Sequence, residues 1–228
     1  MADRVLIVED DADVATFEKM ILERAGYEVR VATTGAAGLE TEPAFKPAVV
    51  LLDVELPDIS GLDVCTSLAN SSDAFILMVS AHSSENDVLR GLGLGADDYI
   101  RKPFSGNELV ARVQSFLRRR ERSRKTEQEG RLGVGGATLV RDFHTLENVG
   151  KSVTLTALEF RLLWYLAENV GKLLTRAQIL ERVWNDVSGV PTRVVDVHVA
   201  ALRKKLNEVV ATLAISSVRG IGYRLDER

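Results

Sequence analysis

The first 120 residues alternate short apolar runs with longer amphipathic stretches. Residues 49–52 are four consecutive branched apolar residues with no polar alternation, a pattern typical of a strand buried on both faces of a parallel sheet. Residues 4–8 and 75–80 form similar runs. We therefore expect all three runs to be strands of one sheet, with the strand that ends at Asp53 at its centre.

Helical periodicity fills the gaps between these runs. In the first gap Phe17, Ile21 and Leu22 recur at helical spacing and are expected to face the core. Residues 27–32 and 96–100 predict two further strands. The expected helices span residues 12–24, 35–42, 61–70, 85–94 and 105–120. Five strands that alternate with five helices predict an α/β fold with a five-stranded, doubly wound parallel sheet.

From residue 132 the pattern changes to short, glycine-rich strands followed by helices. Residues 133–136, 137–140 and 146–149 predict a small antiparallel sheet. Thr156 and Thr175 are each followed three residues later by Glu or Gln, the capping box that begins a helix. Thr192 is expected to cap a third helix over residues 193–207. This succession indicates an α+β domain with a helix-turn-helix.

The third of these helices and the segment after it carry basic residues. Four apolar residues at spacings of 4, 3 and 4 predict the buried stripe of the helix: Val195, Val199, Leu202 and Leu206. Polar or small residues lie off this stripe: Arg193, Asp196, His198, Ala200, Arg203 and Lys204. Residues 215–218 and 223–225 then predict a hairpin with a basic tip at Arg219, which could follow the groove of a nucleic acid.

Residues 118–130 contain no apolar side chain, so we interpret them as a solvated helix end that continues into a flexible tether. The chain is acidic before this segment and basic after it. Residues 1–117 carry 9 basic and 20 acidic groups, and residues 130–228 carry 14 and 10. This asymmetry predicts two domains with different partners, a cation or a regulator for the first and a polyanion for the second.

Composition narrows the function classes. The chain has 228 residues, 46% of them hydrophobic, which is enough for two cores. No apolar run approaches the roughly 20 residues of a membrane span, and no signal-peptide pattern precedes the first strand, so we expect a cytoplasmic protein with no membrane contact. Cys65 is the only cysteine, which excludes an internal disulfide and a thiolate zinc cluster and predicts a core position for its side chain.

Charged and hydroxyl groups follow four of the predicted strands: Glu9, Asp10 and Asp11, then Asp53, Ser80 and Lys102. Right-handed crossovers bring the carboxyl ends of these strands to one edge, where ligands bind in open α/β sheets. Carboxylates gathered there repel one another unless a cation shares the site, and oxygen ligands of this kind suit Mg²⁺. The pattern predicts a carboxylate poised for phosphoryl transfer, with Asp53 as the nucleophile. The alternative is that Asp53 only caps the next helix.

Residues 3–120 resemble the receiver domain of two-component response regulators, a CheY-like fold. The resemblance is carried by Glu9-Asp10, Asp53, Ser80-Ala81, residues 95–100 and Lys102-Pro103-Phe104. It implies that a sensor histidine kinase converts Asp53 to 4-aspartylphosphate. It further implies that Glu9, Asp10, Asp53 and the main-chain carbonyl of Glu55 hold Mg²⁺. Lys102 would pair with the phosphoryl group, the Lys102-Pro103 peptide bond would be cis, and Ser80 and Tyr99 would move together as a switch.

Residues 131–226 resemble the winged-helix effector domain of the OmpR/PhoB type, with residues 193–198 and 218–223 as signature segments. The resemblance implies double-stranded DNA and RNA polymerase as partners. The DNA-contacting residues would be Arg193, His198, Arg203, Lys204, Arg219 and Arg224. For His198 the alternative is a surface or half-buried histidine with no ligand role. Because Ala200 and Ala201 stand where related regulators often carry polar side chains, we expect base recognition to depend more on apolar contact with thymine methyl groups.

These features predict a DNA-binding transcriptional response regulator rather than a dedicated enzyme. The expected domains are a receiver at residues 1–120, a linker at 121–130 and a winged-helix DNA-binding domain at 131–228. Phosphorylation is expected to favour a homodimer. In the family's usual dimer face, the available charges are Asp97 or Asp98 against Arg112. Glu108 lacks its usual basic partner because Val88 occupies that position, unless Arg90 reaches Glu108 from the next turn.

Two other functions remain open from the sequence. A metal-dependent phosphatase of the haloacid dehalogenase type also has an acid after a buried strand, and Asp53 with Glu55 imitates its Asp-x-Asp pair. Its second acid would be Glu here, however, and the first domain is too short for the further motifs of that class. Alternatively, the chain could keep the receiver and use its second half to bind a protein, which salt-dependent DNA binding would distinguish.

Overall fold

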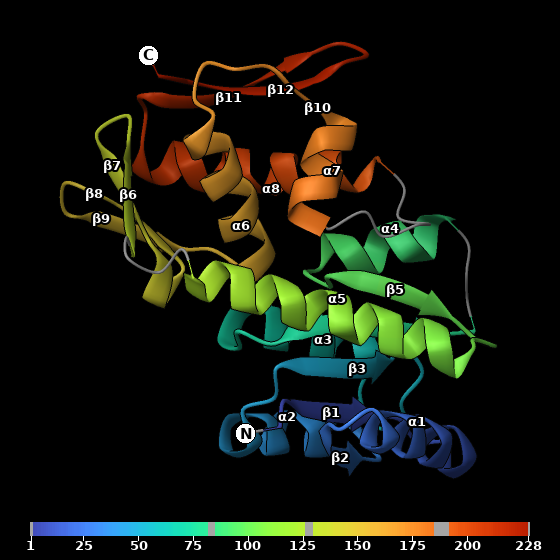
Figure 1. Ribbon diagram of the computed structural model, residues 1–228. Coiled ribbons are helices and arrows are strands. Elements are labelled where there is room, and N and C mark those ends of the chain that lie inside the picture. The colour runs from blue at the N-terminus through green and yellow to red at the C-terminus, as the bar shows by residue number, and fades with distance from the viewer. Residues whose placement is uncertain (1, 82–84, 126–129, 185–191, 228) are drawn as a thin grey trace. The chain divides into compact units, whose positions relative to one another are not determined.

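The computed structural model describes residues 2–81, 85–125, 130–184 and 192–227. The chain forms two compact units, Met1–Arg124 and Lys125–Arg228, and each is described by itself (Figure 1). None of the described helices is long and apolar enough to cross a membrane.

In the described part of the first unit, five parallel strands form one sheet in the order β2-β1-β3-β4-β5 (Figure 1). The strands are β1 (Arg4–Val8), β2 (Glu28–Ala32), β3 (Val49–Asp53), β4 (Phe75–Ser80) and β5 (Asp98–Arg101). Every residue of β3 is buried, as a central strand covered on both faces requires. The predicted sheet and the central position of the strand that ends at Asp53 are confirmed.

Among the described residues, the helices that cover this sheet are α1 (Ala12–Arg24), α2 (Gly35–Phe45), α3 (Gly61–Ser71), α4 (Glu85–Gly93) and α5 (Gly106–Lys125). On one face, Leu22 of α1 and Val113 of α5 join Ile7 of β1 in a common core. On the other face Gly38 of α2 lies against Val8, the neighbour of Ile7 that points the opposite way. The doubly wound arrangement is therefore confirmed, and Cys65 of α3 is a fully buried core residue as expected.

Helix α1 does not bury the residues that its apolar pattern predicted. Its buried residues are Ala15, Glu18 and Leu22, which lie three and four positions apart and share one side of the helix. Phe17 falls off that side and is 38% exposed, and its ring lies 6.2 Å from the ring of Phe104. The expected core position of Phe17 is wrong, and a carboxyl group occupies the core side of α1 instead.

Helix α2 passes its predicted end at residue 42 and continues through Pro43. It ends at Phe45, whose ring is 1% exposed, and Lys46 caps it in the left-handed conformation at φ 49°. Burial of the Phe45 side chain in the core favours this last turn, although a proline inside a helix removes one backbone hydrogen bond. The predicted stop is therefore three residues too early.

Helix α5 begins as predicted but ends later. The Ser105 Oγ accepts a hydrogen bond from the Glu108 N–H at 3.1 Å, so Ser105 caps the start of the helix. The helix ends at Lys125, so residues 121–125 of the predicted linker are helical, while residues 126–129 lie outside the described chain. Arg, Glu and Lys favour helix even without an apolar face, which is why the loss of apolar residues did not end it.

The described part of the second unit combines two antiparallel sheets with helices. The four-stranded sheet contains β6 (Arg131–Val134), β7 (Ala137–Val140), β8 (Thr145–Asn148) and β9 (Lys151–Thr154), with a 3-10 helix η1 (Arg141–Phe143) between β7 and β8. The helices are α6 (Ala157–Glu168), α7 (Arg176–Trp184) and α8 (Val194–Val209). The three-stranded sheet, in the order β10-β12-β11, contains β10 (Leu174–Thr175), β11 (Leu213–Val218) and β12 (Gly222–Glu227). The predicted sheet, helices and hairpin are confirmed, and β9 and β10 are additional.

The capping predictions succeed for two helices and fail for the third. Thr156 forms its capping box with Glu159, and Thr175 exchanges hydrogen bonds with Gln178. Helix α8 instead begins after Arg193, which has helical φ and ψ of −64° and −19° and makes no side-chain cap. A capping hydroxyl needs an extended residue at this point, so the expected role of Thr192 is wrong. The buried stripe of α8 is confirmed, since its four predicted residues are at most 1% exposed.

Candidate phosphorylation site and nucleic-acid interface

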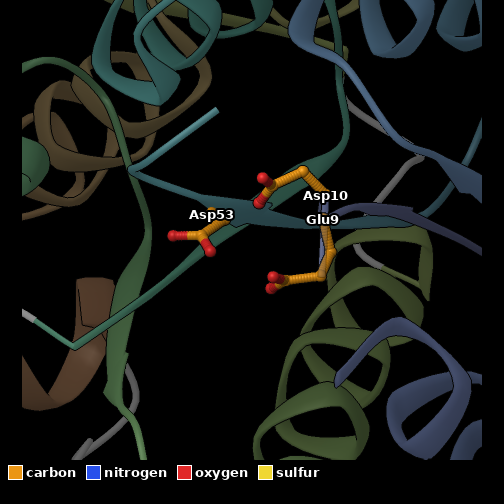
Figure 2. A group of neighbouring side chains, drawn as sticks. All are labelled: Glu9, Asp10 and Asp53. Atoms are coloured by element: carbon orange, nitrogen blue, oxygen red, sulfur yellow. The ribbon is translucent and has the colours of Figure 1, made fainter. Parts of the chain in front are cut away.

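Three carboxylates from two neighbouring strands converge at the carboxyl edge of the first sheet. Asp53 ends β3, and Glu9 and Asp10 directly follow β1 (Figure 2). The pairing of Val8 with Leu52 brings these strand ends level. One carboxylate oxygen of each acid lies within 4.8 Å of the others. Glu9 and Asp53 are buried and Asp10 is exposed, so the cluster opens to solvent on one side.

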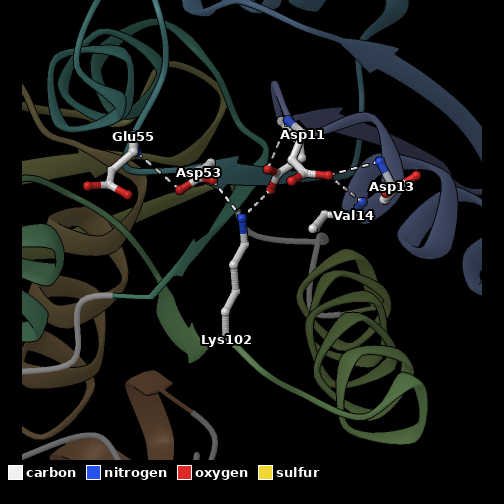
Figure 3. Close-up of polar contacts among 7 residues, drawn as sticks. Asp11, Asp13, Val14, Asp53, Glu55 and Lys102 are labelled. Atoms are coloured by element: carbon white, nitrogen blue, oxygen red, sulfur yellow. Dashed lines mark hydrogen bonds and ion pairs between the residues drawn. The ribbon is translucent and has the colours of Figure 1, made fainter.

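Lys102 brings a positive charge into this cluster. Its Nζ lies 2.6 Å from Asp53 Oδ2 and 2.7 Å from Glu9 Oε2 (Figure 3). Burial lowers the pKa of the Lys102 ammonium, but its hydrogen bonds to Asp53 and Glu9 outweigh burial and the pKa is raised. The ammonium is therefore charged at neutral pH. The peptide bond between Lys102 and Pro103 is cis, as the family resemblance implies.

The electrostatics of the cluster favour a bound cation. Burial raises the pKa of Glu9 to about 7, the hydrogen bond from Lys102 opposes this, and the charge of Asp53 raises it further. Hard carboxylate oxygens that repel one another at this distance are suitable ligands for Mg²⁺, which keeps several waters and needs few protein ligands. The residues present therefore fit the ion that the sequence predicts.

Contacts with the backbone fix the residues around Asp53. Asp11 Oδ1 accepts the N–H groups of Asp13 and Val14 at 2.9 and 3.0 Å and so caps α1 (Figure 3). Asp53 Oδ1 accepts the Glu55 N–H at 3.1 Å, and the Glu55 side chain is exposed. A Cβ at Gly61 would overlap the carbonyl oxygen of Asp53, so only glycine lets α3 start this close to the site.

The side chain of Asp53 does not cap the next helix. The N-cap of α3 is Ser60, whose Oγ accepts the Leu62 N–H at 3.3 Å. The alternative interpretation of Asp53 is therefore wrong, and its carboxylate is engaged by Lys102 and the Glu55 N–H instead.

Ser80 and Tyr99 lie on adjacent strands next to the acidic cluster. Ser80 ends β4 and is fully buried, and Tyr99 in β5 is 9% exposed. The register pairs Asp53 with Val79, so the Ser80 hydroxyl lies one residue beyond the level of Asp53. Ser80 is thus at the same edge as the acids, and Tyr99 pairs with Met78 two residues before the end of β5.

The charged residues of the expected dimer face form contacts within the receiver itself. Asp97 is 2% exposed and accepts the Ile76 N–H at 2.9 Å. Asp98 is 1% exposed and pairs with Arg112 of the same chain at 2.6 Å. Glu108 also pairs with Arg112, at 2.9 Å. Within one chain these carboxylates are buried and already bound, and the pairing of Asp97 or Asp98 with Arg112 across a dimer stays a prediction.

Helix α8 and the hairpin of β11 and β12 carry the candidate nucleic-acid contacts. Arg193, Lys204 and Arg219 are exposed, and Arg219 lies in the hairpin turn, where Gly220 has a positive φ of 75°. Arg224 is also exposed, but its Nε pairs with Asp226 at 2.6 Å. The exposed basic groups thus lie at the start of α8, in its second half and in the hairpin turn.

Two of the predicted DNA contacts are instead engaged within the second unit. His198 is 2% exposed and its ring lies 5.4 Å from the ring of Trp184, so the prediction of a DNA contact for His198 is wrong. The alternative of a surface or half-buried histidine also underestimates its burial. Arg203 is half-buried, and its Nε and Nη2 donate to the Ile215 carbonyl at 2.9 and 2.7 Å. Arg203 therefore ties α8 to β11 rather than presenting these donors to a ligand.

A polar cluster that the sequence did not reveal joins α7, α8 and β12. Asp196 Oδ1 accepts hydrogen bonds from Arg176 Nε at 2.7 Å and from the Tyr223 hydroxyl at 2.6 Å. The guanidinium of Arg176 also lies over the Tyr223 ring, 5.0 Å from its centre. The only sequence signal was that Asp196 lies off the buried stripe of α8. This cluster fixes the hairpin relative to the helix that precedes it.

Comparisons with known proteins agree with this architecture. Residues 5–114 match the family model "Response regulator receiver domain", and residues 150–225 match "Transcriptional regulatory protein, C terminal". The alkaline phosphatase synthesis transcriptional regulatory protein PhoP of Bacillus subtilis is 39% identical over 236 residues, which cover 100% of this chain and 98% of that protein. The chain is a response regulator of the OmpR/PhoB family.

Other relatives extend over both units of this response regulator. The sensory transduction protein RegX3 of Mycobacterium tuberculosis is 40% identical over 97% of this chain and 98% of its own length. The solved structure of DrrB, an OmpR/PhoB homologue from Thermotoga maritima, is 33% identical and covers 99% of this chain and 100% of its own, with a TM-score of 0.51. The solved structure of a RitR mutant is 28% identical with full coverage of both chains and a TM-score of 0.82.

Family membership decides between the functions that the sequence left open. The response regulator combines a receiver with a DNA-binding domain and regulates transcription, so it is not a dedicated enzyme. The phosphatase interpretation and the interpretation of the second half as a protein-binding domain are both wrong. A kinase and DNA follow as partners from the two domains.

Proposed function

We propose that Asp53 accepts a phosphoryl group from the phosphohistidine of a sensor histidine kinase, and that this modification controls DNA binding by the second unit. The observation that supports the proposal best is the position of Asp53, which is 6% exposed at the end of the central strand and lies 2.6 Å from Lys102. Burial beside a fixed positive charge is the environment in which a carboxylate can act as a nucleophile.

In the proposed reaction an Asp53 oxygen attacks phosphorus, and the P–O bond forms as the P–N bond to the histidine breaks. The imidazole leaves with the electron pair and takes a proton from solvent. Lys102 holds Oδ2 and the Glu55 N–H holds Oδ1, so the carboxylate is oriented before the donor arrives. Lys102 and the Ser80 hydroxyl would then bind phosphoryl oxygens.

Mg²⁺ held by Glu9, Asp10, Asp53 and the Glu55 carbonyl would stabilise negative charge on the phosphoryl oxygens as a Lewis acid. The convergence of the three carboxylates supports this assignment. In the same proposal, Ser80 and Tyr99 change position together and alter the outer face of β5. We infer that this change favours a two-fold homodimer, which presents two effector domains to adjacent half-sites and to RNA polymerase.

We further propose that the receiver ends with α5 at Lys125 and that the DNA-binding domain begins with β6 at Arg131. Within the effector, α8 would enter the major groove and the hairpin tip would contact the backbone or the minor groove. The exposed side chains Arg193, Lys204, Arg219 and Arg224 support this orientation.

Asp53→Asn is expected to abolish phosphorylation by a small acyl phosphate in the presence of Mg²⁺, because an amide is a poor nucleophile. Intact-mass measurement should show one added phosphoryl group on the wild-type protein and none on the variant. Sedimentation of the same samples should show the wild type alone shifting toward a dimer. Asp63→Asn, which removes an exposed carboxyl of α3, is the matched control. Normal labelling of Asp53→Asn would exclude Asp53 as the acceptor.

Lys204→Ala and Arg219→Ala are each expected to weaken DNA binding and to lower the slope of log affinity against log salt by about 1, because each neutralises about one phosphate. Titration of a fixed duplex at several salt concentrations measures both effects. Lys172→Ala, an exposed lysine outside α8 and the hairpin, serves as the control. Unchanged slopes for both variants would show that α8 and the hairpin do not face the DNA.

A further inference from the structure

The outer side of α8 is apolar in its middle. Four residues follow one another at helical spacing along this side: Arg193, Val197, Ala200 and Lys204. Val197 is 37% exposed, and Ala200 is also exposed. The basic groups therefore stand at the two ends of a stripe whose centre offers only methyl groups.

The polar neighbours of this stripe are occupied inside the unit. Asp196 binds Arg176 and Tyr223 through Oδ1, and Arg203 donates twice to the Ile215 carbonyl. His198 is 2% exposed against the other side of the helix. These three polar side chains are thus engaged within the unit. The side chains that the centre of α8 exposes are Val197 and Ala200.

A methyl-bearing surface in the major groove can recognise one chemical feature. Each base pair presents hydrogen-bond donors and acceptors there, and thymine alone adds an apolar group, its C5 methyl. Val197 and Ala200 are separated by three residues, a rise of about 4.5 Å along the helix, which is close to the step between neighbouring base pairs. The two side chains can therefore reach adjacent base pairs.

The tip of the β11–β12 hairpin also suits DNA that is rich in A·T pairs. Arg219 is exposed in the turn, beside Gly220 with φ of 75° and Ile221 with 46% exposure. An arginine inserted into the minor groove binds best where A·T pairs narrow that groove and strengthen its negative potential. A thymine-rich half-site would satisfy both the centre of α8 and the tip.

We propose that Val197 and Ala200 are specificity-determining residues that read the C5 methyl groups of adjacent thymines, so that the operator half-site is T-rich at its centre. This proposal depends on the proposed entry of α8 into the major groove. Arg193 and Lys204 hold the helix in the groove from either end, and Val197 and Ala200 select the bases between them.

The test first selects bound sequences from random duplex DNA with the full-length, phosphorylated protein. Each thymine of the selected half-site is then replaced by deoxyuridine, which removes the C5 methyl and leaves every hydrogen-bonding group in place. We expect two adjacent positions at which this replacement weakens binding about fourfold per methyl, the factor that corresponds to ~0.8 kcal/mol for one buried CH₂ group. The salt dependence of binding should not change, because no phosphate contact is lost.

Val197→Ala and Ala200→Gly then assign the two positions. Each variant should lose its response to deoxyuridine at one position and keep it at the other. Val149→Ala, which truncates a 96% exposed valine between β8 and β9, should respond as the wild type does. Because the deoxyuridine series on the wild-type protein needs no variant, a folding defect in Ala200→Gly cannot hide the result.

The outcomes separate this proposal from the proposed function. Sequence-specific, salt-dependent binding that is indifferent to deoxyuridine at every thymine overturns the methyl readout and leaves DNA binding intact. Deoxyuridine sensitivity that persists unchanged in both variants assigns the methyl contacts to other residues and also overturns it. Failure to select any sequence, together with loss of salt-dependent binding, contradicts the proposed function itself.

Discussion

Replacing Arg112 by alanine is expected to destabilise the first unit by about 3–5 kcal/mol at pH 8, because removal of one partner leaves the other charge buried and uncompensated. Asp98 is 1% exposed, and its Oδ2 lies 2.6 Å from Arg112 Nη1. Burial raises the pKa of Asp98 to about 6 even though the charge of Arg112 lowers it. Arg112 is thus the group that keeps Asp98 ionised at neutral pH.

The size of this loss should depend on pH. The pKa of Asp98 in the folded state lies above its usual value of 3.8, so the folded chain binds more protons than the unfolded chain between pH 3.8 and about 6. Stability therefore falls as the pH rises through that window. Without Arg112 the pKa of Asp98 rises further and the window extends upward. The loss of stability caused by Arg112→Ala should be small near pH 4 and should reach its full size at pH 8.

Denaturant unfolding followed by far-UV circular dichroism measures this effect. The two tryptophans of the chain, Trp164 and Trp184, both belong to the second unit, so their fluorescence is an internal reference. Arg101→Ala, an exposed arginine of β5, is the matched control. The double variant Asp98→Asn with Arg112→Leu should recover most of the loss, since it removes both charges. A change below about 0.5 kcal/mol for Arg112→Ala would mean that the pair is solvated.

The same pair changes how dimerisation can be tested. A charge reversal at Arg112 would place a second carboxylate beside buried Asp98 and unfold the receiver before it affected any interface. Loss of the dimer in such a variant would therefore not identify an intermolecular contact. Variants of the exposed residue Glu108, whose pair with Arg112 has little solvent protection, are the safer probes.

The first sheet could be predicted because its information is local. A strand covered on both faces must be apolar throughout, so β1, β3 and β4 were visible as uninterrupted runs. The carboxyl ends of parallel strands lie at one edge, so Glu9, Asp53 and Lys102 could be assigned to one site without knowledge of any side-chain contact.

The errors concern side chains whose environment is set by distant parts of the chain. From the sequence Asp97 and Asp98 have the character of surface charges. In the structure the Asp97 carboxylate accepts the Ile76 N–H, and the Asp98 carboxylate pairs with Arg112. His198 has the polarity of a helix surface, but Trp184 of α7 covers it. No local pattern distinguishes such residues from solvated ones, because Arg112, which pairs with Asp98, and the Ile76 N–H, which binds Asp97, are 14 and 21 positions away.

Helix α1 shows the same limit in the choice of its buried side. The helical spacing of the apolar residues predicted a core position for Phe17, Ile21 and Leu22. The structure buries Ala15, Glu18 and Leu22. Among the described residues no hydrogen-bond partner is found for either carboxyl oxygen of Glu18, which is 1% exposed. A buried glutamate, rather than the predicted phenylalanine, therefore lies on the core side of this helix. Its burial should affect the free energy of unfolding.

Glu18→Leu is expected to stabilise the first unit by about 2–4 kcal/mol at pH 8. Leucine adds buried apolar surface, and the substitution removes a buried polar group whose lack of a partner costs roughly 1–3 kcal/mol. Burial raises the pKa of Glu18 from 4.5 to about 8, the charge of Glu9 raises it further, and the charge of Lys102 opposes the shift. The folded state therefore holds a neutral carboxylic acid at this position at neutral pH.

The pH dependence of this gain follows from the direction of the shift. Between pH 4.5 and about 8 the folded chain retains a proton on Glu18 that the unfolded chain has lost, so the stability of the wild type falls as the pH rises. Glu18→Leu lacks this contribution, and its advantage should grow from pH 5 to pH 8. Glu18→Gln removes the ionisation but keeps an unpartnered polar group, so it should flatten the pH dependence with little gain at pH 5.

Denaturant unfolding at pH 5 and pH 8, with a chelator present so that the acidic site has the same occupancy in all samples, tests this expectation. Glu23→Leu, which changes an exposed glutamate on the same helix, should alter stability by less than about 0.5 kcal/mol. If Glu18→Leu is destabilising and Glu18→Gln retains the wild-type pH dependence, then Glu18 is ionised and bound in the folded protein. Its carboxylate would then belong to the charge network of Glu9 and Lys102 rather than to the apolar core.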